Sequence, residues 1–155
     1  MLLLAAAIAL PLALLGRSDP STTSPPQYER DVTAVLVGLV ADFRGVGADR
    51  GAGAISARLS SMKAGLDHAA ARLDSLPPPE NVAELQRSLV AELRDYAREI
   101  DLVRASVDFG DPITIASHLR EISAPAAINR TLGRLEAMGY RIPVRMALVG
   151  ARGRG

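Results

Sequence analysis

Apolar residues recur every three or four positions along most of this chain, and this spacing restricts it to packed α-helices. The clearest case is the segment from residue 80 to residue 109. Side chains three and four residues apart lie on one face of a helix, so the segment forms one apolar stripe along a helix of roughly 45 Å. The stripe consists of Val82, Leu85, Leu89, Leu93, Tyr96, Ile100, Val103 and Val107.

Three further segments carry the same spacing. We therefore expect helices over residues 27–44, 52–76 and 112–139 in addition to the helix over residues 80–109. We find no segment with the two-residue alternation of a β-strand. Four amphipathic helices joined by short links favour an antiparallel up-down bundle. The predicted fold is therefore all-α, with a four-helix bundle over residues 27–139.

Proline and glycine residues mark the ends of these helices. Residues 77–79 are three consecutive prolines, which stop the second helix. Gly110 suits the end of a helix and Pro112 the first position of the next, so a sharp turn is expected between them. Pro125 removes a hydrogen bond inside the last helix, and the apolar positions shift in phase after it. A kink is therefore predicted near residues 123–125.

The first sixteen residues are expected to direct export or to anchor the chain. Residues 2–15 form an unbroken apolar run that would be about 21 Å long as a helix. This is short for a helix that crosses the hydrocarbon core of a membrane, which is roughly 30 Å thick. This length favours a cleaved signal, with a short uncleaved anchor or a core helix as alternatives. Residues 17–26, rich in Ser, Thr and Pro, follow as a tether. We therefore expect an extracytoplasmic protein, either secreted or anchored to the membrane.

Composition excludes several kinds of chemistry. The chain has no cysteine, so disulfides, thiolate metal sites and thiol nucleophiles are absent. Lys and Arg number 18 and Asp and Glu number 17, a balance that does not select nucleic acid. With no Trp and few Phe or Tyr, the core is expected to be aliphatic. No cofactor motif is present, so no cofactor is expected.

The C-terminal segment, residues 140–155, is basic. We expect residues 144–149 to dock on the bundle, because they are mostly apolar. Contact with anionic lipid headgroups is an alternative to a solvated tail, and export argues against nucleic acid. The positive charges of this segment come from Arg141, Arg145, Arg152 and Arg154.

Candidate catalytic residues are few. His118 and Glu121 lie one turn apart on the last helix and are the candidate metal ligands, although a di-metal bundle needs further carboxylates. His68 is expected to face solvent. Ser60 and Lys63 match the bare Ser-x-x-Lys spacing without its partner motifs. No catalytic residue is therefore assigned, and the chain is not expected to be an enzyme.

The overall layout resembles exported, lipoprotein-like helical-bundle proteins of unknown function from GC-rich bacteria. The resemblance rests on a lipoprotein-like signal, in which Arg17 replaces the lipidated cysteine, on the Ser/Thr/Pro tether, and on the Leu-Pro-Pro-Pro and Gly-Asp-Pro turns. The resemblance implies a helical fold but does not indicate which activity the protein has.

Three functions remain open. The first is a non-catalytic module that binds an envelope protein or a second copy of itself, for which exposed Leu102, opposite the apolar stripe, is a possible contact. The second is a bundle that senses or carries a small apolar ligand near Pro125. The third is a metal-binding bundle that uses His118 and Glu121.

Overall fold

The computed structural model describes residues 23–43, 51–110 and 112–146. The predicted signal or anchor over residues 1–16, most of the tether, and residues 147–155 lie outside these ranges. The part that is described contains helices and no strand, which confirms the all-α prediction. The helices are α1 (Pro25–Phe43), α2 (Ala52–Asp74), the 3-10 helix η1 (Glu80–Val82), α3 (Ala83–Phe109), α4 (Pro112–Glu121) and α5 (Ala124–Ala137).

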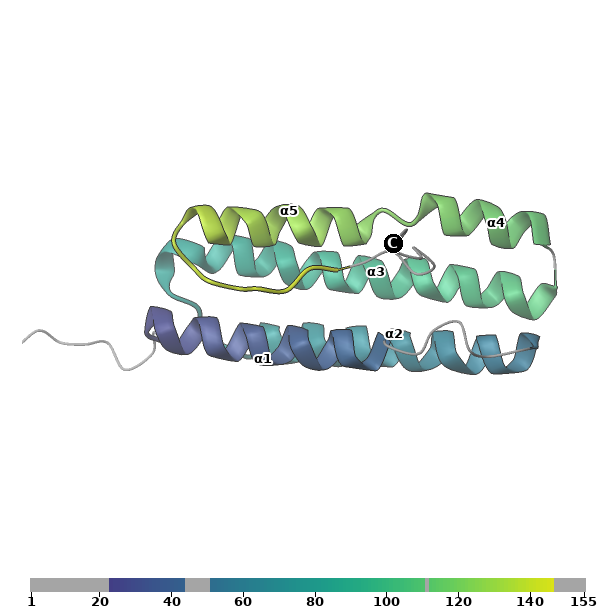
Figure 1. Ribbon diagram of the computed structural model, residues 1–155, viewed down its shortest axis with the longest axis horizontal. Helices are drawn as coiled ribbons and strands as arrows, with labels where there is room; N and C mark the ends of the chain where they lie inside the picture. Colours follow the sequence, from purple (N-terminus) through teal and green to yellow (C-terminus); the bar gives the residue numbers. More distant parts are fainter. Residues whose placement is uncertain (1–22, 44–50, 111, 147–155) are drawn as a thin grey trace, which may run out of the picture.

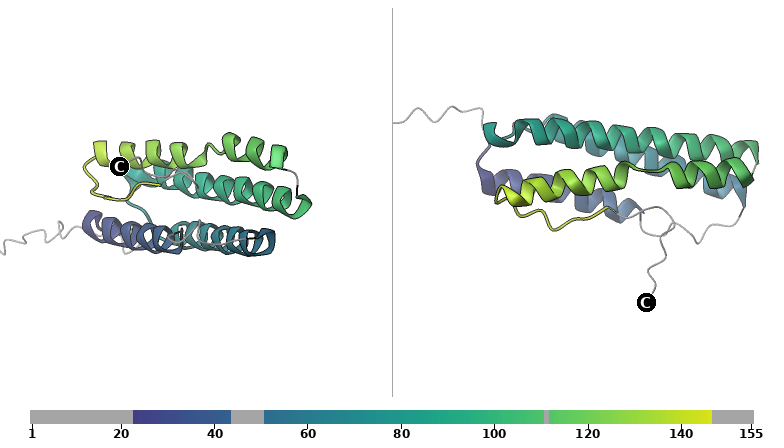
Figure 2. Two further views of the ribbon diagram at one scale, coloured as in Figure 1. Left: turned by 45° about the vertical axis from the view of Figure 1, so that its right-hand side comes forward. Right: turned by 90° about the horizontal axis from the view of Figure 1, so that it is seen from above.

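The chain direction alternates from α1 to α2, to α3 and to α4 (Figure 1). The helices α4 and α5 follow one another along α3 and together occupy the fourth position of the bundle (Figures 1 and 2). The α3 helix is central, because it packs against α2, α4 and α5. Its predicted stripe is buried in full, from Val82 in η1 to Val107.

The N-terminal helix begins earlier than the sequence indicates. We expected it to start at Gln27, after a tether that included Pro25 and Pro26, but α1 begins at Pro25. Proline is favoured in the first turn because that turn has no internal acceptor for its N–H groups. The Tyr28 amide donates to the Ser24 carbonyl at 2.9 Å and closes this turn.

The predicted kink near Pro125 is a complete break. The α4 helix ends at Glu121 and α5 begins at Ala124, with Pro125 in its first turn. A proline that would distort a helix interior is accommodated at a helix start, because no N–H is needed there. The predicted helix over residues 112–139 is therefore two helices.

Three residues of the predicted stripes are substantially exposed. Ile55 at the start of α2 is 40% exposed, Leu119 on α4 39% and Met138 after α5 44%. Each lies near a helix end, where fewer neighbouring helices are available to cover it. His68 is exposed, as expected.

The core is less aliphatic than composition indicated. Tyr28, Tyr96 and Tyr140 are all buried. The rings of Tyr28 and Tyr140 meet edge to face with centroids 5.6 Å apart, and those of Phe43 and Tyr96 meet similarly at 5.9 Å. Such pairs add to the stability gained by burial alone.

The chain reverses after α5 and runs back as an extended segment, which we call the strap (residues 140–146). It lies along α5 and reaches α1 through the Tyr28–Tyr140 contact (Figures 1 and 2). Val144 and Met146 are buried, so docking is confirmed for the described part of residues 144–149. Tyr140 and Ile142 are buried as well, so docking begins earlier than expected.

Candidate interaction surfaces

The two candidate metal ligands have separate partners. His118 Nδ1 lies 2.6 Å from the hydroxyl of Ser106 on α3. The Glu121 carboxylate instead accepts a hydrogen bond of 3.1 Å from Ser117 Oγ. Within the described ranges, no group of three His, Asp or Glu residues has the arrangement to hold a metal ion.

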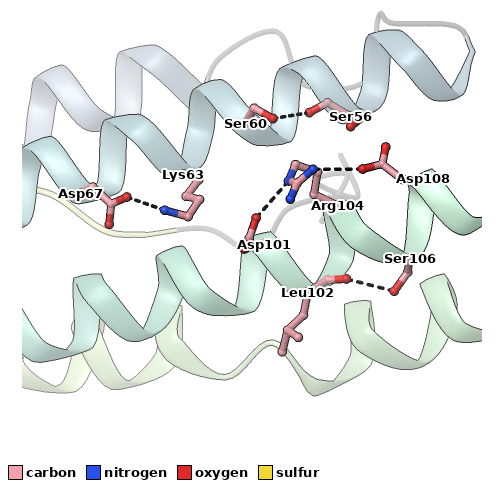
Figure 3. Close-up of polar contacts among 9 residues, drawn as sticks. All are labelled: Ser56, Ser60, Lys63, Asp67, Asp101, Leu102, Arg104, Ser106 and Asp108. Carbon is pink, nitrogen blue, oxygen red and sulfur yellow. Dashed lines mark hydrogen bonds and ion pairs between the residues drawn. The ribbon is translucent and has the colours of Figure 1, made fainter.

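The Ser106–His118 pair ties α4 to α3. Ser106 is only 3% exposed, and its hydroxyl donates to the Leu102 carbonyl at 2.9 Å (Figure 3). Because a hydroxyl has one proton, this arrangement assigns the donor role in the Ser106–His118 pair to His118 Nδ1. With its proton directed to the backbone, Ser106 is not activated as a nucleophile, and the pair satisfies a buried polar group.

The Ser-x-x-Lys spacing on α2 does not form a catalytic pair. Ser60 donates to the Ser56 carbonyl at 3.0 Å, and Lys63 forms an ion pair of 2.7 Å with Asp67 (Figure 3). The hydrogen bond that the Lys63 ammonium donates to the Asp67 carboxylate raises the pKa of Lys63. A base needs the neutral amine, so this shift works against such a role.

Exposed apolar side chains gather on the α3–α4 hairpin. Phe109 is 88% exposed and Ile113 79%, one on each side of the turn. Leu102, 56% exposed, is seven residues before Phe109 and therefore shares its face of α3. We call these three side chains together with Leu119 the hairpin patch. Leu102 was expected to be exposed, whereas Phe109 and Ile113 were missed.

The helical period explains why the two residues of the hairpin patch on α3 are exposed. Leu102 and Phe109 each follow a buried residue of α3, Ile100 or Val107, by two positions, which is about 200° around a helix. Gly110, with φ of 72°, ends α3 as predicted, while Asp111 in the predicted turn lies outside the described residues. The spacing of Phe109 from the stripe could have revealed its exposure.

The strap is fastened to the bundle at several points. The Tyr140 hydroxyl donates to Asn81 Oδ1 at 3.0 Å, and Arg145 forms an ion pair of 2.6 Å with Glu136. Along the strap, buried residues alternate with exposed ones. This two-residue period is already present in the sequence of residues 140–146, although no segment with strand-like alternation was predicted there.

Two shallow hollows flank the strap. One, of about 510 Å³, is lined by Glu136 and residues 139–143, and the other, of about 390 Å³, lies between α1 and Arg141 with Pro143. Both lie near the C-terminal end of α5, away from Pro125 at its N-terminal end.

The predicted basic residues differ in their surroundings: Arg145 is paired, Arg141 is exposed, and Arg152 and Arg154 lie outside the described residues.

The described residues thus define an all-helical bundle with an extended C-terminal strap. No protein-family model, curated protein or solved structure matches the chain. Among the described helices, none combines the length and the apolar character needed to cross a membrane.

Proposed function

We propose that the chain is an exported, non-catalytic module of the cell envelope that binds another protein through the hairpin patch. The exposure of Phe109 and Ile113 on both sides of one turn carries this proposal. Large apolar side chains held in water are costly unless a partner covers them, and aromatic residues are enriched at the centres of protein interfaces.

A binding role also agrees with the state of the reactive side chains. His118 is bonded to Ser106, and Lys63 is paired with Asp67. These contacts hold side chains in place, and none of them brings a nucleophile, a base and an orienting group together. The polar groups of the hairpin therefore support its structure, while its apolar groups face outward.

The export part of the proposal rests on residues 1–16. Because α1 begins at Pro25, eight residues separate this segment from the first helix, a reach of at most about 29 Å. If the apolar run is held in a membrane, the start of α1 stays close to it. The hairpin turn lies at the opposite end of α3, whose 27 residues measure about 40 Å. An anchored bundle would present the patch away from the membrane.

Site-specific photo-crosslinking of the full chain in its own cells tests the binding proposal. A photoreactive amino acid at position 109 or 113 should give a discrete adduct with another protein. Position 37 on α1 is the matched control, since Val37 is 53% exposed and apolar but lies outside the patch. Adducts at 109 and 113 that are no stronger than at 37 would refute binding through the hairpin.

A patch variant and the N-terminal mass complete the test. Phe109→Asp should abolish the adduct formed from position 113 while leaving the helical content unchanged, because Phe109 contributes little to the core. Intact mass of the envelope-derived protein distinguishes a cleaved signal from a retained anchor. Recovery of the chain in the cytoplasm alone would overturn the export proposal.

A further inference from the structure

The strap packs against the bundle as an extended peptide lies in a groove. Its side chains alternate strictly, with three exposed residues between four buried ones. Ile142 is fully buried at its centre. The strap lies between α1 and α5 (Figure 1), where the ring of Tyr140 meets Tyr28 of α1 and the main chain of Met146 meets Asn129 of α5. Its buried side chains are Tyr140, Ile142, Val144 and Met146.

Asn129 of α5 holds the main chain of the strap as a neighbouring strand would. Its Nδ2 donates to the Met146 carbonyl at 2.8 Å, and its Oδ1 accepts from the Met146 amide at 2.8 Å. This reciprocal pair reproduces the two hydrogen bonds exchanged between paired residues of an antiparallel sheet. It recognises an extended backbone whatever its side chains are. Glu136 adds selectivity through its ion pair with Arg145.

The hinge between α5 and the strap depends on one glycine. Gly139 has φ of 93°, its amide donates to the Glu136 carbonyl at 2.9 Å, and the Tyr140 amide donates to the Leu135 carbonyl at 3.1 Å. These two bonds form a Schellman motif, which turns the chain back onto the bundle. The closed position of the strap therefore requires a left-handed conformation that an alanine adopts only with strain.

We propose that the α1–α5 seam is a groove for an extended segment and that two copies of this chain associate by exchanging straps. Each strap would lie in the groove of the other copy. The exchanged strap makes every contact that the closed strap makes, so only the hinge differs between the two forms. This self-association is independent of the hairpin patch, which stays free for another partner.

A hinge substitution tests the exchange directly. Gly139→Ala penalises the closed turn, whereas an opened hinge needs no positive φ. In detergent solution, the full chain carrying this change should show a several-fold larger dimer fraction by light scattering than the unchanged chain at equal concentration. Gly133→Ala is the matched control, because a Cβ added there meets nothing within 4 Å and no positive φ is involved. It should leave the dimer fraction unchanged.

Cross-linking identifies the surface used by the dimer. Since the chain has no cysteine, single Glu136→Cys and Arg145→Cys chains, each also carrying Gly139→Ala, can be mixed and treated with a short bismaleimide. Exchange should give heterodimers joined between positions 136 and 145. A Glu84→Cys chain replaces the Glu136→Cys chain in the control, because Glu84 is exposed on α3 and pairs with Arg87.

Two results would overturn the proposal. One is a Gly139→Ala chain whose dimer fraction equals that of the Gly133→Ala control. The other is a 136–145 heterodimer that is no more abundant than the 84–145 control. Phe109→Asp should leave the exchanged dimer intact, so loss of hairpin binding and loss of strap exchange are distinguishable.

Discussion

Three hydrogen bonds join Glu99 of α3 to Ser123 at the start of α5. Both oxygens of the carboxylate accept from the Ser123 amide at 3.2 Å, and Oε1 accepts from its hydroxyl at 3.0 Å. Glu99 also accepts from the Ala124 amide at 3.1 Å. The first N–H groups of a helix have no internal acceptor, and the Ser123 side chain does not cap them. A residue from another helix therefore supplies the cap of α5.

Replacement of this carboxylate should destabilise the bundle. Glu99→Ala leaves two main-chain donors at the break without their acceptor and removes a negative charge from a helix N-terminus. We expect a loss of about 1–2 kcal/mol in the free energy of unfolding, measured by urea denaturation. Asp95→Ala, on the same helix but in an exposed pair with Arg98, should cost less than about 1 kcal/mol. Equal losses in both variants would contradict the capping role.

Gln86 performs the corresponding function at the other end of the bundle. Its Nε2 donates to the carbonyls of Leu73 and Leu76 at 2.8 Å each, which satisfies the C-terminal end of α2 and the residue just before Pro77. The prolines that follow have no N–H to offer. Gln86→Leu should therefore lower the free energy of unfolding by about 1 kcal/mol, because the Leu76 carbonyl loses its donor while the Leu73 carbonyl keeps the Leu76 amide, and the unpaired Oε1 of Gln86 is removed as well. Arg87→Leu, at an exposed neighbouring position, is the control, and an equally large effect there would refute this assignment.

These two caps explain why the sequence predicts the helices better than their connections. The stripe of α3 follows from spacing alone, and Gly110 marks its end. Glu99 and Gln86 sit beside the stripe, where periodicity assigns polar residues to solvent. Their partners are 24 and 13 positions away, and only the folded arrangement brings them together. The same reason hid the break before Pro125, since a start for α5 depends on Glu99.

The surface features of the candidate site could be predicted from the sequence only in part. Exposure of Leu102 follows from its position relative to the core stripe. The partner of His118 could not be inferred, because Ser106 lies on another helix and within a run that reads as core. The strap was missed although its alternation is local, because a single extended segment can be buried here only by the seam between α1 and α5.

Removal of the hydroxyl group should change the stability of the protein in opposite directions at Tyr28 and at Tyr140. The Tyr140 hydroxyl donates to Asn81, whereas the Tyr28 hydroxyl is buried with no hydrogen-bond partner. Tyr140→Phe should lower the free energy of unfolding by about 1 kcal/mol. Tyr28→Phe should leave it unchanged or raise it, because an unpaired buried group is removed. Both variants keep the contact between the two rings. Thermal denaturation of each variant therefore measures the contribution of its hydroxyl group alone.

Burial of Tyr28 also predicts alkaline destabilisation. Desolvation, with a smaller contribution from Tyr140, raises the pKa of Tyr28 to about 12. The unfolded chain loses this proton near pH 10, so between pH 10 and 12 the folded state binds more protons and its stability falls as pH rises. The urea midpoint should decline through this range, and Tyr28→Phe should decline less steeply. Parallel curves for the two proteins would contradict the prediction.

Glu92 of α3 should make stability depend on pH in the acidic range. Thr131 of α5 donates to its Oε1 at 2.8 Å, while Oε2 is buried without a hydrogen-bond partner. Desolvation raises the pKa of this carboxyl, and the Thr131 hydrogen bond and the charges of Arg130 and Arg134 oppose that shift. Because the folded state holds the proton more tightly, the contribution of Glu92 is most favourable below its ordinary pKa of about 4.3. That contribution is lost as pH rises through the higher pKa of the folded state.

Glu92→Gln removes the charge and retains an oxygen that can accept from Thr131. At pH 7 this variant should be more stable than the unchanged chain, and the difference should vanish near pH 3, where the carboxyl is protonated. Thr131→Val should act in the other direction, since loss of its hydrogen bond leaves the carboxylate less satisfied and therefore costs more at pH 7 than at pH 3. Thermal denaturation of the three proteins across this range provides the measurement. A Glu92→Gln chain that is less stable at pH 7 would mean that attraction to Arg130 and Arg134 outweighs the cost of burying the charge.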